Sequence, residues 1–332
     1  MGLFIFILVL CATVYYFGWY SLPENIDPHE FQEPPDERDM LKGAEPFFFK
    51  GKSDTAFLLV HGYESSPFTL LGLGKQLHAC GHTVFAPLLP GHGTTIKQLE
   101  KTRYEHWYEA VRRLYVKERM NYKNFFVVGF SLGGNLSLRL AIQYRQEMAP
   151  SALILISTPV ALNGFLNSAL VVRDWRLIFS GIARFFLGPV TKRRDLVSMD
   201  ILNPTITYNE AYVIPPLHSF RTNVGKVKKY LRYITVPLCI IHASNDKTIH
   251  AENGHYIFRK VNSADKQAFM FKIDEDISTR HEILTHETIR DKVDNYVFSF
   301  LNDHNKKFQF ASEEFRRYKE FPKEKRTEKR KR

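Results

Sequence analysis

The pentapeptide at residues 129–133 is the part of the chain whose residue types and spacing point most directly to chemistry. It reads Gly-Phe-Ser-Leu-Gly and lies between an apolar run, 125–128, and a stretch with helical character, 132–145. In a strand–turn–helix context the pattern G-x-S-x-G exposes the serine hydroxyl at a turn too tight for flanking side chains. The backbone N–H of Leu132 then lies at a helix N-terminus, where it stabilises developing negative charge. The pattern predicts Ser131 as a nucleophile.

A serine hydroxyl becomes a good nucleophile when a base takes its proton and an acid orients that base. In proteins with this turn the order along the chain is serine, acid, histidine. Asp246 follows the apolar run 236–243, and His281 follows the apolar run 268–273. Both would lie past the carboxyl ends of strands, the edge where open α/β sheets bind ligands. We therefore predict Asp246 as the orienting acid and His281 as the base.

Other residues compete for these roles. Asp246 could be a simple turn former, as aspartate often is. Asp274 and Asp276 are rival acids, but they lie in the loop expected to hold the histidine. His286 is a rival base at the start of the last expected helix, roughly 287–301. His242 lies inside an expected strand, which favours a place in the core or behind the acid.

A second donor for a tetrahedral oxyanion is expected in the loop after an earlier strand. The run 55–60 has the apolar character of such a strand, and His61-Gly62-Tyr63 follows it. The backbone N–H of Tyr63 would then act together with that of Leu132. One such donor lowers the barrier by roughly 3 kcal/mol. The alternative is that these residues only end the strand.

Taken together, these segments resemble the α/β-hydrolase superfamily, and most closely its bacterial carboxylesterases and monoacylglycerol lipases. The matching stretches lie at residues 58–63, 90–93, 129–134, 245–246 and 278–281. They occur in family order between about residues 45 and 301, so the resemblance covers most of the chain.

The resemblance implies the α/β-hydrolase fold, a mostly parallel, doubly wound sheet with a helical cap insertion. It also implies a catalytic role for Ser131, Asp246 and His281, oxyanion donors at Tyr63 and Leu132, and no metal or organic cofactor. The chain departs from the family at one position that bears on the site. Members often carry glycine immediately before the catalytic histidine, and this chain has Arg280. The departure would alter the mouth of the site or its charge preference.

Alternating strand-like and helical stretches predict one hydrolase domain at 46–304. About 80 residues separate the strand 152–156 from the next strand, far more than a crossover needs. We expect the cap in this interval, at about 158–235. Residues 163–187 are rich in apolar side chains interspersed with charges, which predicts one or two amphipathic helices. Such helices would line an acyl-chain pocket, pack on the domain body, or do both.

The N-terminal segment 1–20 is almost wholly apolar and has no charged side chain. Residues 3–20 would form a helix of about 27 Å, enough to cross a bilayer core. Because basic residues before it and a small-x-small cleavage site are missing, we favour a single-pass transmembrane anchor over a cleaved signal peptide. The next segment, 21–45, holds four prolines and eight acids against two bases, which predicts an extended, solvated linker. This acidic flank favours the non-cytosolic side for the catalytic domain, although acids contribute little to that rule.

The formal net charge of +11 is unevenly distributed. Residues 305–332 carry 12 Lys or Arg and 5 acids, and anionic lipid is one partner for this basic tail. A solvated tail is an equally good interpretation, and no nucleic-acid partner is expected. The three cysteines, Cys11, Cys80 and Cys239, form no disulfide framework.

We expect a membrane-associated serine hydrolase that cleaves carboxylic esters, lipid-derived ones such as monoacylglycerol, through an acyl-enzyme on Ser131. The same residues would serve an acyltransferase or a thioesterase, and the sequence does not separate these reactions. A non-catalytic scaffold of the same fold is the remote alternative, against which the intact serine, acid and histidine argue.

Overall fold

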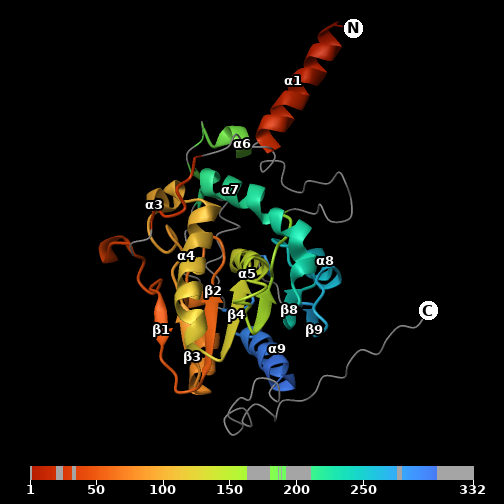
Figure 1. Ribbon diagram of the computed structural model, residues 1–332. Coiled ribbons are helices and arrows are strands. Elements are labelled where there is room, and N and C mark those ends of the chain that lie inside the picture. Colours follow the sequence, from red (N-terminus) through yellow and green to blue (C-terminus); the bar gives the residue numbers. More distant parts are fainter. Residues whose placement is uncertain are drawn as a thin grey trace, which may run out of the picture.

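The computed structural model describes residues 2–19, 25–31, 35–162, 180–185, 187, 189–191, 211–274 and 279–304. Seven strands form one sheet in the order β1-β3-β2-β4-β5-β8-β9 (Figure 1). They are β1 (Phe47–Phe49), β2 (Thr55–Val60), β3 (Thr83–Ala86), β4 (Asn124–Phe130), β5 (Ala152–Ile156), β8 (Leu238–Ala243) and β9 (Lys266–Phe271).

Only the pairing of β1 with β3 is antiparallel in this sheet, and the other strands run parallel. After the edge strand β1, the chain forms β2, adds β3 between β1 and β2, and then continues on the other side of β2 with β4. The predicted mostly parallel, doubly wound sheet is therefore confirmed. A separate two-stranded sheet joins β6 (Val190–Thr191) and β7 (Ala211–Tyr212).

Helices cover both faces of the sheet. Phe57 and Leu59 of β2 pack with α2 (Phe68–Ala79) and α9 (Arg290–Asp303). Leu58 and Val60 point to the opposite face. That face is covered by α4 (Tyr104–Glu118), α5 (Leu132–Gln143), η5 (Lys226–Tyr233) and α8 (Glu252–Lys260). Because strands buried on both faces need apolar residues at every position, β2 and β4 appear in the sequence as continuous apolar runs.

The remaining elements lie before and after these layers. They are α1 (Gly2–Trp19), η1 (Glu37–Asp39), α3 (Ile96–Lys101), η2 (Arg119–Asn121), α6 (Ser180–Ala183) and α7 (Ile214–Val224). In Figure 1, α6 and α7 lie beyond one end of the sheet, and α1 projects away from the molecule at the same end. Both belong to the interval 158–235 in which we expect the cap.

The predicted transmembrane helix is not supported by the structure. Residues 2–19 do form α1, a helix of 18 residues. In the part of the chain that is described, no helix combines the length and the apolarity needed to cross a membrane.

The acidic segment after α1 packs on the hydrolase domain in its described parts, which differs from the solvated linker that its composition predicts. The ring of Phe31 lies 5.0 Å from that of His106 on α4. The backbone N–H of Leu41 donates to the Gly93 carbonyl, and Ala44 is fully buried. Single apolar side chains in an acidic segment are enough to dock it.

Two predictions fall largely outside the described residues. The expected amphipathic helices at 163–187 are described only from residue 180, where α6 begins. The basic tail at 305–332 lies wholly outside.

Candidate active site

Ser131 lies in the turn between β4 and α5 with φ +51° and ψ −117°. A non-glycine residue adopts this backbone conformation only when its surroundings enforce it. The neighbouring glycines explain how the turn fits. A Cβ on Gly133 would overlap the carbonyl of Val60, and a Cβ on Gly129 would lie 2.5 Å from the Gly133 oxygen. The backbone N–H of Ser131 donates to the Ile156 carbonyl over 2.9 Å, which fixes the turn against the end of β5.

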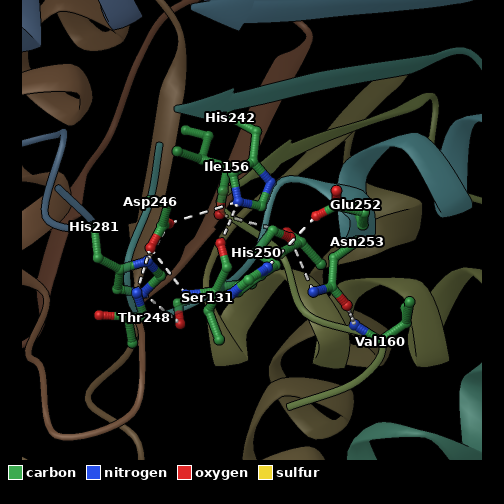
Figure 2. Close-up of polar contacts among 12 residues, drawn as sticks. Ser131, Ile156, Val160, His242, Asp246, Thr248, His250, Glu252, Asn253 and His281 are labelled. Atoms are coloured by element: carbon green, nitrogen blue, oxygen red, sulfur yellow. Dashed lines mark hydrogen bonds and ion pairs between the residues drawn. The ribbon is translucent and has the colours of Figure 1, made fainter. Parts of the chain in front are cut away.

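The structure brings Ser131, His281 and Asp246 together at the carboxyl edge of the sheet (Figure 2). His281 Nδ1 lies 2.7 Å from Asp246 Oδ2, and His281 Nε2 lies 3.0 Å from Ser131 Oγ. A carboxylate only accepts hydrogen bonds, so the ring proton is on Nδ1 and Nε2 is free to accept the serine proton. All three residues are buried. This is the geometry of a serine nucleophile, its base and an orienting acid.

Asp246 is held as an anion by its neighbours. Its Oδ1 accepts the backbone N–H groups of Thr248 and Ile249, both at 2.8 Å. Burial alone would raise the pKa of Asp246. The charge on His281 and hydrogen bonds from His242 and His281 outweigh that effect and lower the pKa to about 2. The acid is therefore ionised throughout the neutral range.

His281 responds in the opposite direction. Burial disfavours its charged form, but the charge of Asp246 and the hydrogen bond to it prevail, and the pKa of His281 is raised above its usual value. A base with a raised pKa takes a proton more readily in the transition state. It also has to be neutral at the start, which sets the lower pH limit of activity.

The proposed oxyanion loop lies against the nucleophile. A Cβ on Gly62 would lie 3.2 Å from the Ser131 Cβ, tighter than an ordinary contact, so glycine lets the backbone lie this close to the serine without displacing it. Tyr63 follows, and its hydroxyl donates to the Val213 carbonyl just before α7 over 3.1 Å. Leu132 is the first residue of α5. The residues expected to donate to the oxyanion, Tyr63 and Leu132, therefore directly follow Gly62 and Ser131.

His61 is a positioning residue that sequence reasoning missed. Its Nε2 accepts the backbone N–H of Leu89 over 3.0 Å, so its proton is on Nδ1, which donates to the Gly62 carbonyl over 2.9 Å. Because a peptide unit is planar, holding the Gly62 carbonyl also fixes the direction of the Tyr63 N–H. Complete burial lowers the pKa of His61 to about 4, which keeps this arrangement neutral.

Asn135, one turn after the nucleophile, ties both ends of the interval expected to hold the cap. Its Nδ2 donates to the carbonyls of Pro159 and Val224 over 2.9 and 3.0 Å. Its Oδ1 accepts the Tyr104 hydroxyl over 2.7 Å. The side chain is fully buried, so all of its hydrogen bonds are made within the protein. Sequence spacing could not reveal this role, because the partners lie far along the chain.

Asn253 makes a second connection of the same kind. Its Oδ1 accepts the backbone N–H groups of Val160 and Ala161 over 2.8 and 2.9 Å, and its Nδ2 donates to the His250 carbonyl (Figure 2). The first residues after β5 are thereby joined to the loop that carries Asp246.

The rival residues lie elsewhere. Asp274 is exposed and pairs with Lys272 over 2.6 Å, and Asp276 is outside the described residues. The ring of His286 bonds Thr288 just before α9. His242 is buried behind the acid, with Nε2 2.9 Å from the Ile249 carbonyl and 3.5 Å from Asp246 Oδ2.

Arg280, the departure from the family pattern, adopts φ +55°. Glycine adopts this left-handed conformation without strain, which fits the glycine that the family resemblance leads us to expect at this position. The sequence indicated a difference at the mouth of the site, and the structure shows its backbone basis.

The chain matches a known protein family over most of its length. The family model described as "Serine aminopeptidase, S33" (Hydrolase_4) matches residues 51–288, which include every residue named above as nucleophile, acid, base or oxyanion donor.

Two curated relatives have names that refer to esters. A thermostable monoacylglycerol lipase of Bacillus sp. (strain H-257) is 27% identical over 231 residues, 69% of this chain and 84% of the relative. A carboxylesterase of Bacillus subtilis (strain 168) is 24% identical over 257 residues, 77% of this chain and 95% of the relative. Among solved structures, the monoacylglycerol lipase of Paleococcus ferrophilus matches with a TM-score of 0.61 and 19% identity, over 78% of this chain and 98% of that one. At that identity the likeness shows the fold.

Proposed function

Because the chain belongs to the Hydrolase_4 family of serine hydrolases, we propose that it cleaves carboxylic esters such as monoacylglycerol through an acyl-enzyme on Ser131. The observation that carries the proposal is the continuous hydrogen-bonded series from Ser131 through His281 to Asp246. The names of the two curated relatives support an ester as substrate. The family description mentions an aminopeptidase, so an amide substrate belongs among the controls.

The first half of the proposed reaction acylates the enzyme. Ser131 Oγ attacks the ester carbonyl while its proton moves to His281 Nε2. The new imidazolium donates to Asp246, whose low pKa keeps it anionic. The carbonyl oxygen becomes an oxyanion that accepts the N–H groups of Tyr63 and Leu132, each of which stabilises it by roughly 3 kcal/mol. His281 then gives its proton to the leaving alcohol.

The second half releases the acid. Water takes the place of the alcohol, and His281 Nε2 removes a proton from it as it attacks the acyl carbonyl. A second oxyanion forms in the same place, and collapse returns the proton to Ser131 Oγ. Transfer to another alcohol or from a thioester would use the same groups, so product analysis with an added alcohol acceptor distinguishes an acyltransferase.

A substrate panel tests the proposal. The wild-type protein should hydrolyse monoacylglycerols and p-nitrophenyl esters, whereas an aminoacyl p-nitroanilide should be a poor substrate. Ser131→Ala should lose both ester activities. Release of p-nitroaniline without ester cleavage would show that the protein is a peptidase and not an esterase. Activity restricted to short p-nitrophenyl esters would contradict a lipid-derived ester as substrate.

We further propose that α1 associates with lipid. The side chains of Phe4 to Leu10 are all exposed, Phe4 to 67%, and a contiguous apolar surface of this kind marks an interaction site. Removal of residues 2–19 should reduce the share of the protein in the membrane fraction while hydrolysis of a soluble short ester continues. Retention of the shortened chain to the same extent as the full chain would assign the association to another part. The acidic flank at 21–45 supports the non-cytosolic side for the catalytic domain, which a protease-protection assay on sealed vesicles tests.

A further inference from the structure

A group of unneutralised cations lies on the outer surface of η5 and its neighbours. Residues 211–245 contain five Lys or Arg and no acid. On the structure, η5 contacts both α5 and α8, and exposed cations from all three segments surround it. We call this surface the basic face; its members are Arg145, Lys226, Lys229, Arg232, Arg259 and Lys260, with Tyr230, Tyr233 and Tyr256 between them.

Aromatic rings hold several of these cations in place. The guanidinium groups of Arg145 and Arg232 lie 5.2 and 5.0 Å from the centre of the Tyr233 ring. Tyr230 stacks on Tyr233 at 6.4 Å. On the other side, the Lys260 ammonium lies 5.9 Å from the Tyr256 ring. A ring orients a cation without cancelling its charge, whereas a carboxylate would neutralise it.

No member of the basic face forms an ion pair with another residue in the described ranges. Cations at the C-terminal end of a helix often only complement its dipole, which accounts for Arg232, Arg259 and Lys260. It does not account for Lys226, the first residue of η5, where the dipole opposes a positive charge, or for Lys229 in the middle of that helix. The positive surface is therefore larger than the helix ends require.

We propose that the basic face binds the anionic surface of a lipid bilayer. Exposed cations attract acidic lipid head groups, and tyrosine side chains suit the boundary between head groups and water. Tyr230 and Tyr233 are 50% and 39% exposed, so they are accessible to that boundary. This contact is separate from α1 and goes beyond the proposed ester chemistry, because it concerns attachment of the enzyme to a surface and not the reaction at Ser131.

The aromatic geometry favours lipid over nucleic acid. Single-stranded nucleic acids stack their bases on free ring faces. Here the Tyr233 ring already contacts Tyr230 and two guanidinium groups, so it offers no open stacking platform.

The test uses the full chain and vesicles of two compositions, phosphatidylcholine alone and phosphatidylcholine with 30% phosphatidylglycerol. The ratio of binding to the two vesicles isolates the charge effect from any contribution of α1. The wild type should prefer the anionic vesicles, and the preference should weaken as salt rises. The face variant combines Arg145→Gln, Lys229→Gln, Arg232→Gln and Lys260→Gln, and should lose at least about tenfold in the binding ratio, since each basic residue contributes about fivefold.

A matched control carries the same change in net charge at other exposed positions, namely Lys52→Gln, Lys75→Gln, Lys97→Gln and Lys101→Gln. It should keep the wild-type ratio within about twofold. Both variants should retain hydrolysis of a soluble short ester, which separates this test from that of the proposed function. The proposal is overturned if the wild type binds both vesicles equally, or if the two variants lose binding alike. Loss of binding to a 20-nucleotide RNA by the face variant, with vesicle binding intact, would assign the surface to nucleic acid instead.

Discussion

The charge of Asp246 controls the protonation of His281, and this gives the first prediction at the residue scale. Asp246→Asn should lower the pKa of His281, because the nearby negative charge that raises it is gone. Since His281 acts as a neutral base, the acid limb of kcat/KM should have its midpoint above 6.5 in the wild type and at lower pH in the variant. The maximal rate should fall on the order of 10³–10⁴-fold through loss of orientation.

Asp274→Asn is the control for this experiment, because Asp274 is exposed and pairs with Lys272 away from His281. Its pH profile should match that of the wild type. If the midpoint of the acid limb in Asp246→Asn equals that of the wild type, a group other than Asp246 sets the pKa of the base.

His61 gives the second prediction at this scale. His61→Ala should reduce kcat by about 10–100-fold with a smaller effect on KM, because the Tyr63 N–H loses its fixed direction and an oxyanion donor acts mainly in the transition state. His255→Ala, at an exposed position on α8, is the control. If the His61→Ala protein folds and its kcat is unchanged, His61 does not orient the Tyr63 N–H for catalysis.

Single residues were predictable where chemistry restricts their type. The G-x-S-x-G pattern and the order of acid and base pointed to Ser131, Asp246 and His281, and the structure places them within hydrogen-bonding distance. The sequence could not reveal the support given by His61, because its effect depends on which ring nitrogen meets Leu89. The same holds for Arg280, whose unusual φ is visible only in the backbone.

At the scale of elements, Asn135 connects α5 with the two ends of the interval expected to hold the cap. Asn135→Ala should lower the free energy of unfolding by about 3 kcal/mol or more, because it leaves two carbonyls and a hydroxyl buried without partners. Urea unfolding measures the loss. Asn121→Ala, which removes only exposed hydrogen bonds, should change stability by less than about 0.5 kcal/mol.

Asp294 gives a second prediction at this scale, for the contact between α9 and α2. Gln76 Nε2 donates to Asp294 Oδ2 over 2.5 Å, while burial raises the pKa of Asp294 to about 7. Its unfolded pKa is about 3.9. Between these values the folded state holds a proton that the unfolded state has lost, so stability falls as pH rises toward 7. Asp294→Asn should remove this dependence and exceed the wild type by about 1–3 kcal/mol at pH 8, with little difference at pH 4.

Thermal or urea unfolding at several pH values tests this prediction. Asp303→Asn, at an exposed position near the C-terminal end of the same helix, should leave the pH dependence unchanged. A wild-type stability that is flat between pH 4 and 8 would contradict it.

Elements were predictable where they are long and buried on both faces. The runs at β2, β4, β5 and β8 are continuous and apolar, so their position and type followed from the sequence. β1 has three residues and lies at the sheet edge, too short for a periodicity to appear. The segment 25–31 was expected in solvent, because one docking aromatic, Phe31, contributes little to composition.

For the whole molecule, the sequence gives the charge but not its distribution in space. The excess of positive residues was visible by counting, and it drew attention to residues 305–332. The basic face became visible only in the fold, because Arg145, Arg232 and Lys260 are far apart in the sequence and meet through the packing of three helices. Length and apolarity suggested a membrane span at the N-terminus, but no helix in the described part of the chain combines the two to the extent that a span requires.

The measurement that tests the central claim most directly is covalent labelling with a fluorophosphonate, followed by peptide mapping. An activated serine reacts with this probe at phosphorus, and Oγ takes the place of the fluoride. The wild type should be labelled once, at Ser131, and labelling should disappear in Ser131→Ala and His281→Ala while His286→Ala keeps it. Absence of label in the folded wild type, or label that survives His281→Ala, would contradict the account of Ser131 as a nucleophile activated by His281.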